Sequence, residues 1–199
     1  MPKIDNITFL GYADAKEADD PFQSSFEVAK LCAQKGLTVV NGAGPGVMKA
    51  STEGAHAGGG KAIGITFYPK DIPMFEGRDE TNKVDQLIVC DNYLERTLKL
   101  LETGQIHVIF NGGTGTISEF GMAWGLARLY FGHHKPLVLY GDFWQKIIFA
   151  FTEGMYIRPE ERQVFKIVSK PQEVIEAIDE FGKIIEAEAH VHKNPIFSI

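Results

Sequence analysis

The residues from Asn111 to Glu119 have the composition of a phosphate-binding loop. They read Asn-Gly-Gly-Thr-Gly-Thr-Ile-Ser-Glu and join a short apolar run to a longer, helix-like segment. Glycine lets a ligand approach the backbone closely, and backbone N–H groups at a helix N-terminus bind anions. The candidate phosphate ligands are therefore the glycines and threonines of this loop: Gly112, Gly113, Thr114, Gly115 and Thr116.

Glu119 supports two interpretations. Thr116 and Glu119 have the spacing of a helix capping box, in which the glutamate binds backbone at the start of the helix. Alternatively, Glu119 lies on a half-apolar stripe, where burial would raise the pKa of its carboxyl and a cation would lower it.

The helix that carries Glu119 is predicted to be apolar on two opposite faces. One face holds Ile117, Phe120, Gly121 and Trp124, and the other holds Glu119, Ala123, Leu126 and Tyr130. One apolar face can cover a sheet, but the second needs a lid or a partner chain. This pattern predicts a homo-oligomer, either a dimer or an assembly of dimers.

A second glycine loop, containing Gly42, Gly44 and Gly46, is another candidate for ligand binding. It follows a GxGxG pattern rather than the GxGxxG of dinucleotide-binding proteins. No acidic residue stands at 60–66, where a ribose ligand is expected. A nicotinamide or flavin cofactor is therefore not predicted. The loop is either a tight strand-to-helix turn or a set of N–H groups aimed at an anion.

Arg96 lies on a predicted helix over residues 91–104. The leucines at 94, 98 and 101 predict the stripe that faces the core, and Arg96 then points away from it. An arginine in that place is either solvated or a fixed fork. Such a fork would bind a phosphate or a base, or would orient a carboxylate.

These candidate residues are positioned by alternating strands and helices. Apolar runs predict strands at 7–11, 37–42, 61–67, 86–90, 107–111, 135–141 and 165–169. Helical patterns lie at 21–35, 44–59, 91–104, from 116 to about 132, 143–157 and 171–189. The alternation predicts an α/β, Rossmann-like, doubly wound three-layer sandwich with a mainly parallel sheet. Ligands bind such sheets at the carboxyl ends of the strands, where both glycine loops fall.

Composition narrows the class of protein. The chain of 199 residues is predicted to form one domain over 1–189, followed by a tail at 190–199. Its net charge is −6 with no long basic run, so no nucleic-acid polymer is expected as a partner. No apolar run suits a membrane and no secretory pattern opens the chain. Cys32 and Cys90 lack CxxC spacing, which favours reduced thiols in the cytoplasm. An HxH in the tail lacks a third ligand nearby, so no metal site is predicted.

The order of these motifs resembles the Lonely Guy family of cytokinin-activating phosphoribohydrolases, and the related molybdenum-cofactor carrier proteins, over about residues 5–180. The family's first loop resembles Gly42-Ala43-Gly44 followed by Gly46-Val47-Met48. Its Pro-Gly-Gly-x-Gly-Thr-x-x-Glu motif matches 111–119, and its helical Arg-Lys pair falls on 96–97. The resemblance implies that Arg96 and Glu119 are catalytic and that Met48 belongs to the nucleotide site.

Three residues depart from the family pattern. Thr97 replaces the lysine, Asn111 replaces the proline, and Ser118 replaces the first of two adjacent glutamates. The family was long labelled as lysine decarboxylases. No lysine here stands in a context suited to a pyridoxal Schiff base, so decarboxylation is not expected.

The resemblance implies hydrolysis of the N-glycosidic bond of a nucleoside 5′-monophosphate, giving a free base and ribose 5-phosphate. The loop 112–116 would hold the phosphate, while Gly44 and Gly46 would let the sugar or base approach. Glu119 would stabilise an oxocarbenium-like state or activate water, and Arg96 would keep Glu119 ionised and orient the substrate. No cofactor is expected. The alternatives are a carrier or a sensor of a nucleotide-like ligand without turnover, which the missing lysine and glutamate favour.

Overall fold

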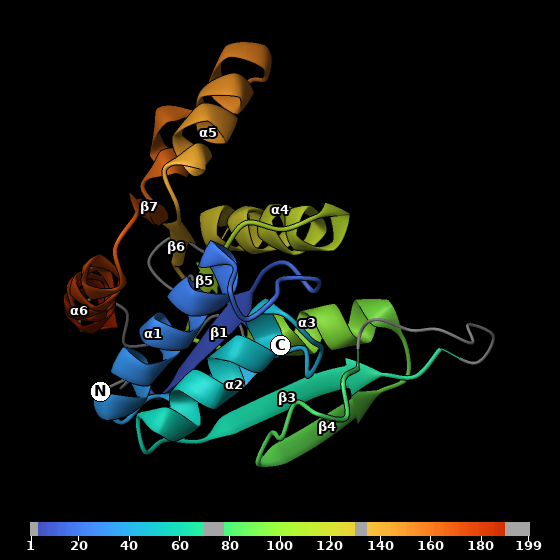
Figure 1. Ribbon diagram of the computed structural model, residues 1–199. Coiled ribbons are helices and arrows are strands. Elements are labelled where there is room, and N and C mark those ends of the chain that lie inside the picture. Colours follow the sequence, from blue (N-terminus) through green and yellow to red (C-terminus); the bar gives the residue numbers. More distant parts are fainter. Residues whose placement is uncertain (1–3, 70–77, 130–134, 190–199) are drawn as a thin grey trace.

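The computed structural model describes residues 4–69, 78–129 and 135–189, and in them seven strands form one sheet (Figure 1). The strands are β1 (Asn6–Leu10), β2 (Thr38–Asn41), β3 (Ala62–Phe67), β4 (Gln86–Cys90), β5 (Ile106–Ile109), β6 (Leu137–Tyr140) and β7 (Phe165–Val168). Their order is β4-β3-β2-β1-β5-β6-β7, and each neighbouring pair is parallel. The predicted doubly wound architecture is confirmed, and the sheet is parallel throughout.

Helices cover both faces of this sheet. In the described residues they are α1 (Asp20–Gln34), α2 (Val47–Ala57), α3 (Tyr93–Thr103), α4 (Thr114–Leu129), α5 (Phe143–Gly154) and α6 (Pro171–Ala189). One apolar core lies between the sheet and α1, α2 and α6, and a second lies between the sheet and α3, α4 and α5. Because β5 and β6 are buried on both faces, their sequences are continuous apolar runs.

The strand order reverses between β1 and β5, and this reversal positions the site. The chain leaves β1 toward β2 on one side, whereas β5 pairs with β1 on the other. Connections that diverge in this way open a crevice at the carboxyl ends of the two strands. Backbone bonding continues beyond the strands, since the N–H of Tyr12 donates to the carbonyl of Asn111 at 2.9 Å. The loops after β1 and β5 therefore lie side by side at the crevice.

Helix α3 buries a different face from the one that its leucines predicted. Leu94 and Leu98 are 65% and 46% exposed. The prediction that they face the core is therefore wrong for two of the three leucines of the stripe. The buried residues of α3 are Arg96, Thr97, Leu100 and Leu101. The leucines of α3 allow two alternative stripes. The observed one prevails because β3 and α4 supply hydrogen-bond partners for the inward guanidinium of Arg96.

Helix α4 begins earlier than the capping-box interpretation requires. Its i→i−4 bonding starts with the N–H of Ile117 donating to the carbonyl of Gly113 at 3.0 Å, so Thr116 lies inside the first turn. Glu119 lies in the second turn and binds Arg96 instead of the start of the helix. The capping box is therefore not formed.

The faces of α4 also differ from the prediction. Its buried residues are Thr116, Glu119, Phe120, Ala123 and Ala127. Phe120 therefore shares the buried face of Glu119 instead of opposing it, because the two side chains are only about 100° apart around the helix. Tyr130 lies outside the described residues, as does the predicted tail at 190–199.

A short 3-10 helix, Pro159–Arg162, lies between α5 and β7 and was not predicted. None of the described helices combines the length and apolar character that crossing a bilayer requires.

Candidate active site

A cavity of about 350 Å³ opens at the crevice between the ends of β1 and β5. Its walls come from the loop after β1, the start of the glycine loop at 42–46, α2, the end of β3, α3 and the first turns of α4. The described residues that line it are Phe9, Leu10, Gly11, Tyr12, Ala13, Asp14, Gly42, Met48, Phe67, Tyr93, Arg96, Gly113, Thr114, Gly115, Thr116 and Glu119. The structure thus brings most of the predicted site residues together, but Gly44, Gly46 and Gly112 are not in the lining.

Arg96 is fixed within the floor of this cavity. The residue is 8% exposed, and its Nε donates to the carbonyl of Ile65 on β3 at 3.2 Å. Its Nη1 forms a hydrogen bond and ion pair with Oε1 of Glu119. A Cβ at position 42 would collide with its Nη2, so only Gly42 leaves room for the guanidinium. The second interpretation of Arg96, a fork that orients a carboxylate, is the one that the structure adopts.

Glu119 faces Arg96 from α4 and is 6% exposed. Burial raises the pKa of the Glu119 carboxyl, because the charged form loses its hydration. The charge and hydrogen bond of Arg96 oppose that rise. A carboxyl held between these two effects is a candidate for chemistry that needs a base or an anionic stabiliser.

The N-terminus of α4 forms another wall of the cavity. Gly113, Thr114 and Gly115 are exposed to the cavity, and a Cβ added at either glycine would meet nothing within 4 Å. The first N–H groups of a helix have no partner within the helix, so they are free to bind an anion. Gly112 differs, because a Cβ there would collide with Oγ1 of Thr116. Gly112 therefore serves local packing rather than the cavity.

Two glycines of the loop at 42–46 also support the local fold and do not line the cavity. Gly46 has a φ of 62°, and a Cβ there would collide with the carbonyls of Tyr12 and Ala13. The carbonyl of Gly44 accepts a hydrogen bond of 2.8 Å from Nδ2 of the buried Asn82. The loop is thus the tight turn that was one of its two predicted forms, and Gly42 with Met48 is the part that reaches the cavity.

Sequence reasoning missed several lining residues. Tyr12 and Asp14 follow β1, Phe67 ends β3, and Tyr93 begins α3. A signal for the first two existed, because the rule that ligands bind at the carboxyl ends of strands applies to β1 as much as to β5. Nothing in local spacing marks the two aromatic residues.

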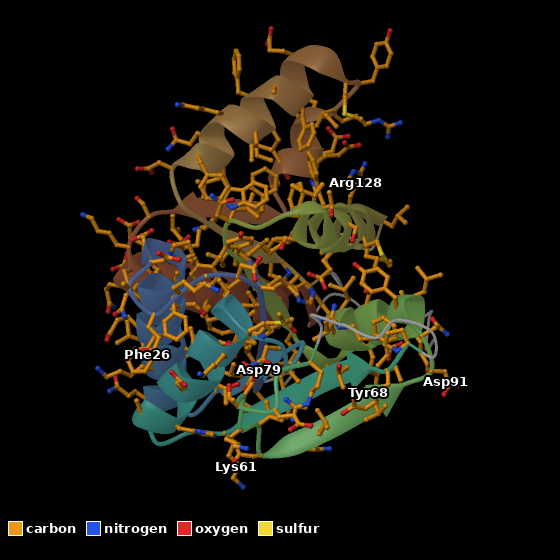
Figure 2. All side chains as sticks on the ribbon, turned by 45° about the vertical axis from the view of Figure 1, so that its right-hand side comes forward. Phe26, Lys61, Tyr68, Asp79, Asp91 and Arg128 are labelled. Atoms are coloured by element: carbon orange, nitrogen blue, oxygen red, sulfur yellow. The ribbon has the colours of Figure 1, made fainter. Side chains whose placement is uncertain are left out.

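The carboxyls nearest to Arg96 in the sequence lie outside the cavity lining. Asp91 and Glu95 are exposed, and Oε2 of Glu95 accepts a bond of 2.9 Å from the backbone N–H of Asp91. Figure 2 shows Asp91 at the outer edge of the molecule, beside the end of β4. Among the described lining residues, Asp14 is the one carboxyl besides Glu119.

The cavity lining contains little free positive charge. Arg96 is the single lysine or arginine among the described lining residues, and it is already paired with Glu119. A phosphate would therefore depend on the uncharged N–H and hydroxyl donors of α4. No cluster of three potential metal ligands occurs in the parts of the chain that the structure describes.

The three departures from the family pattern lie outside the described cavity lining. Thr97, on α3, is fully buried, whereas Asn111 and Ser118 are exposed. Ser118 nevertheless contacts a lining residue, since its Oγ lies 2.9 Å from the hydroxyl oxygen of Tyr93.

A second, apolar groove of about 460 Å³ lies on the other side of α4. The described residues that line it come from α4 and α5 and from the segment after α5: Ile117, Phe120, Gly121, Trp124, Gly125, Arg128, Leu129, Phe151, Met155, Ile157 and Glu161. Nε1 of Trp124 donates to the carbonyl of Glu161 at 2.6 Å. Arg128 pairs with Glu160 at 3.5 Å, and Figure 2 shows it above α4, toward α5.

Known proteins resemble this chain in sequence and in fold. The SLOG cluster4 family (LDcluster4) matches residues 5–175. The cytokinin riboside 5′-monophosphate phosphoribohydrolase of Mycobacterium tuberculosis is 30% identical over 159 residues, which cover 76% of this chain and 81% of that protein. A "probable cytokinin riboside 5′-monophosphate phosphoribohydrolase" of Oryza sativa subsp. japonica is 27% identical over 168 residues, which cover 80% of this chain and 66% of that protein.

A solved structure agrees with the fold. The molybdenum cofactor binding protein of Rippkaea orientalis is 22% identical with a TM-score of 0.67, covering 91% of this chain and 99% of that one. At this identity the likeness concerns architecture alone. The chain therefore belongs to the SLOG cluster4 family and is a homologue of the cytokinin riboside 5′-monophosphate phosphoribohydrolases, in agreement with the Lonely Guy resemblance of its motifs.

Proposed function

We propose that the protein hydrolyses the N-glycosidic bond of a nucleoside 5′-monophosphate, giving a free base and ribose 5-phosphate. The observation that carries this proposal is the buried Arg96–Glu119 pair in one cavity with the open N-terminus of α4. A phosphate at the helix N-terminus would leave the sugar within the cavity that the pair lines. Two homologues are named for this class of reaction.

In the proposed reaction, the bond between the anomeric carbon and the base nitrogen breaks, and its electron pair leaves with the base. Water forms the new bond to the anomeric carbon, which passes through an oxocarbenium-like state. The carboxylate of Glu119 either takes the proton of that water or stabilises the positive charge, and both roles need the ionised form. Arg96 favours that form through its charge and orients the carboxylate.

The departures from the family pattern leave this machinery in place. Thr97 and Ser118 lie outside the described lining, whereas the arginine and glutamate are paired within it. This arrangement supports turnover over the alternative of a carrier without chemistry.

Incubation with a panel of nucleoside 5′-monophosphates tests the proposal, with free base and ribose 5-phosphate measured together. We expect equal amounts of both products from at least one monophosphate. Binding without release of base from any member of the panel would overturn the proposal and favour the carrier.

We further propose that the chain functions as a homo-oligomer in a reducing compartment. The apolar groove beside α4 and the exposed Leu129 suit a second copy of the chain. Both cysteines are free and buried, which suits the cytoplasm.

A further inference from the structure

Asn41 is the last residue of β2, and its side chain is completely buried beneath the cavity residues. Its Oδ1 accepts a bond of 2.8 Å from the backbone N–H of Ala43. Its Nδ2 lies 3.0 Å from Oγ of Ser51 and 2.9 Å from Oγ1 of Thr52, and both of these residues are buried as well. The amide therefore joins the glycine loop at 42–46 to the second turn of α2.

The partners of Asn41 fix the orientation of its amide. The N–H of Ala43 can only donate, so the atom that faces it must be the oxygen. The nitrogen then faces the two hydroxyls and uses both of its hydrogens on them. The hydroxyls donate in turn to the carbonyl of Met48, at 2.7 Å from Ser51 and 3.4 Å from Thr52. Both polar atoms of the amide are thus satisfied, and the network ends on Met48, which lines the cavity.

The network holds Ala43 in a backbone conformation that alanine rarely adopts. Its φ of 57° is the one positive φ of a non-glycine residue in the part of the chain that the structure describes. Such backbone persists only where the surroundings hold it, and it clusters at functional sites. Here Asn41 holds the N–H, and the N–H of Asp79 donates to the carbonyl at 3.0 Å. The methyl group lies over Gly64 of β3, where a Cβ would collide with it.

Gly42 is the point where this turn meets the Arg96–Glu119 pair. A Cβ at position 42 would collide with Nη2 of Arg96 and with Sδ of Met48, so both side chains pack directly on the backbone there. That backbone is the surface on which the guanidinium lies while its Nη1 binds Glu119. A shift of the turn would move this surface and release the guanidinium from its orientation.

We propose that Asn41 is a positioning residue of the site. Its amide holds the turn at 42–43 in place, and the turn keeps the guanidinium of Arg96 directed at Glu119. A fully buried polar network is costly to assemble, and an apolar side chain would fill the same space without needing four partners. The role in the reaction rests on the proposed function, whereas the placement of Arg96 does not require turnover.

Asn41→Leu tests this role, because leucine fills the space and leaves the N–H of Ala43 without its partner. We expect kcat for base release to fall by about tenfold to a hundredfold, since misplacing a catalytic group by about 1 Å has effects of this size. KM should change by less than about threefold, because the N-terminus of α4 is untouched. The acid limb of kcat/KM should move to higher pH, because a displaced Arg96 opposes the effect of burial on the pKa of Glu119 less strongly.

Carbon-13 NMR titration of the Glu119 carboxyl measures the same displacement without turnover. Comparison with Glu119→Gln assigns the resonance. In Asn41→Leu the midpoint should lie at higher pH than in the wild type, a change that the loss of a merely structural hydrogen bond would not produce.

Rescue and control variants separate positioning from a loss of stability. Ala43→Gly in the Asn41→Leu background should recover part of kcat, because glycine adopts a positive φ without a hydrogen bond to hold it. Thr52→Val removes one acceptor of the amide and keeps the shape, so it should cause smaller changes of the same sign if Asn41→Leu unfolds. Val174→Ala is the matched control, because Val174 is completely buried on α6 and absent from the described lining. It should lower the melting temperature and leave kcat and the acid limb unchanged.

Wild-type kcat and an unchanged Glu119 titration in Asn41→Leu would overturn the inference. Changes that Val174→Ala reproduces would overturn it too. A wild-type protein that releases no base would instead overturn the proposed function. In that case a raised midpoint in the NMR titration would still support the positioning of Arg96 by Asn41, and an unchanged midpoint would refute it.

Discussion

The two sides of α4 differ in charge and in polarity. On the cavity side, the helix presents its N-terminal glycines and a buried carboxylate paired with arginine. On the groove side, it presents Ile117, Gly121 and Leu129 beside the aromatic and aliphatic side chains of α5. One helix thus separates a cavity that contains a buried ion pair from a larger and more apolar groove.

The difference indicates which surface carries chemistry and which suits a partner. A buried ion pair is costly to desolvate, and well-packed apolar residues would often stabilise the fold as well or better. Arg96 and Glu119 are therefore poorly explained by stability alone. The groove needs no such explanation, because covering an exposed apolar surface is favourable by itself.

The largest expected effect concerns the pair in the cavity. Glu119→Gln keeps the size of the side chain and can still accept the hydrogen bond of Arg96, but it cannot act as a base. We expect at least about a 100-fold loss in base release, with nucleotide binding retained. Melting should stay near that of the wild type, because glutamine fills the same space and keeps a hydrogen bond to the buried guanidinium of Arg96.

The same pair predicts non-additive kinetics. Arg96→Ala should lose activity to a degree comparable with Glu119→Gln, and the double variant should lose little more, since the two groups act as one unit. Steady-state rates of the four proteins measure this cycle. Losses that multiply would show that the two side chains act independently, and Glu119→Gln at more than half the wild-type rate would exclude a catalytic role.

Binding should depend on the glycine that faces the cavity and not on the one that faces the groove. Gly115 and Gly121 both lie on α4, and a Cβ at either would meet nothing within 4 Å. Gly115→Val places methyl groups where a phosphate would approach, and should lose at least about tenfold in affinity, or about 1.4 kcal/mol. Gly121→Val is the matched control, and calorimetry should show unchanged affinity. Equal losses in both variants would indicate damage to the helix instead.

The pH dependence of the rate should follow the protonation of Glu119. Its pKa is raised by burial, so kcat/KM should fall with decreasing pH at a higher pH than for an ordinary glutamate. Arg96→Met removes the charge that opposes the rise, so the acid limb should move to still higher pH. Arg96→Lys keeps a cation and should move it less. A limb at the same pH in all three proteins would assign it to another group.

The smallest expected effect on chemistry concerns the groove. Light scattering should show at least twice the 22.1 kDa of one chain at micromolar concentration. Leu129 is 75% exposed in the groove, and Leu129→Glu should shift the protein toward the monomer. Ile184→Glu, at an exposed apolar position on α6, is the control and should not. A wild-type monomer would show that this groove does not join copies of the chain.

The sequence predicted the fold well because each element carries its own signal. Buried strands and amphipathic helices follow from local periodicity, and the order of elements leaves few topologies for a parallel sheet. The Arg96–Glu119 pair was predicted only through the family resemblance. Leucine spacing alone placed Arg96 on the wrong side of α3, because periodicity does not register that Ile65 and Glu119 would satisfy a buried guanidinium.

The rest of the site depends on which strand ends meet. Tyr12 and Asp14 reach the cavity because the sheet order reverses at β1. Phe67 and Tyr93 come together from two elements, and no spacing within either element marks them. Such contacts arise from topology, which a single sequence does not display.

The most direct test is a crystal structure of the Glu119→Gln protein with AMP bound. Our account predicts the phosphate on the N–H groups at the start of α4, with the anomeric carbon facing residue 119 and the side chain of Arg96 beside it. A phosphate bound away from α4, or an anomeric carbon out of reach of residue 119, would contradict it.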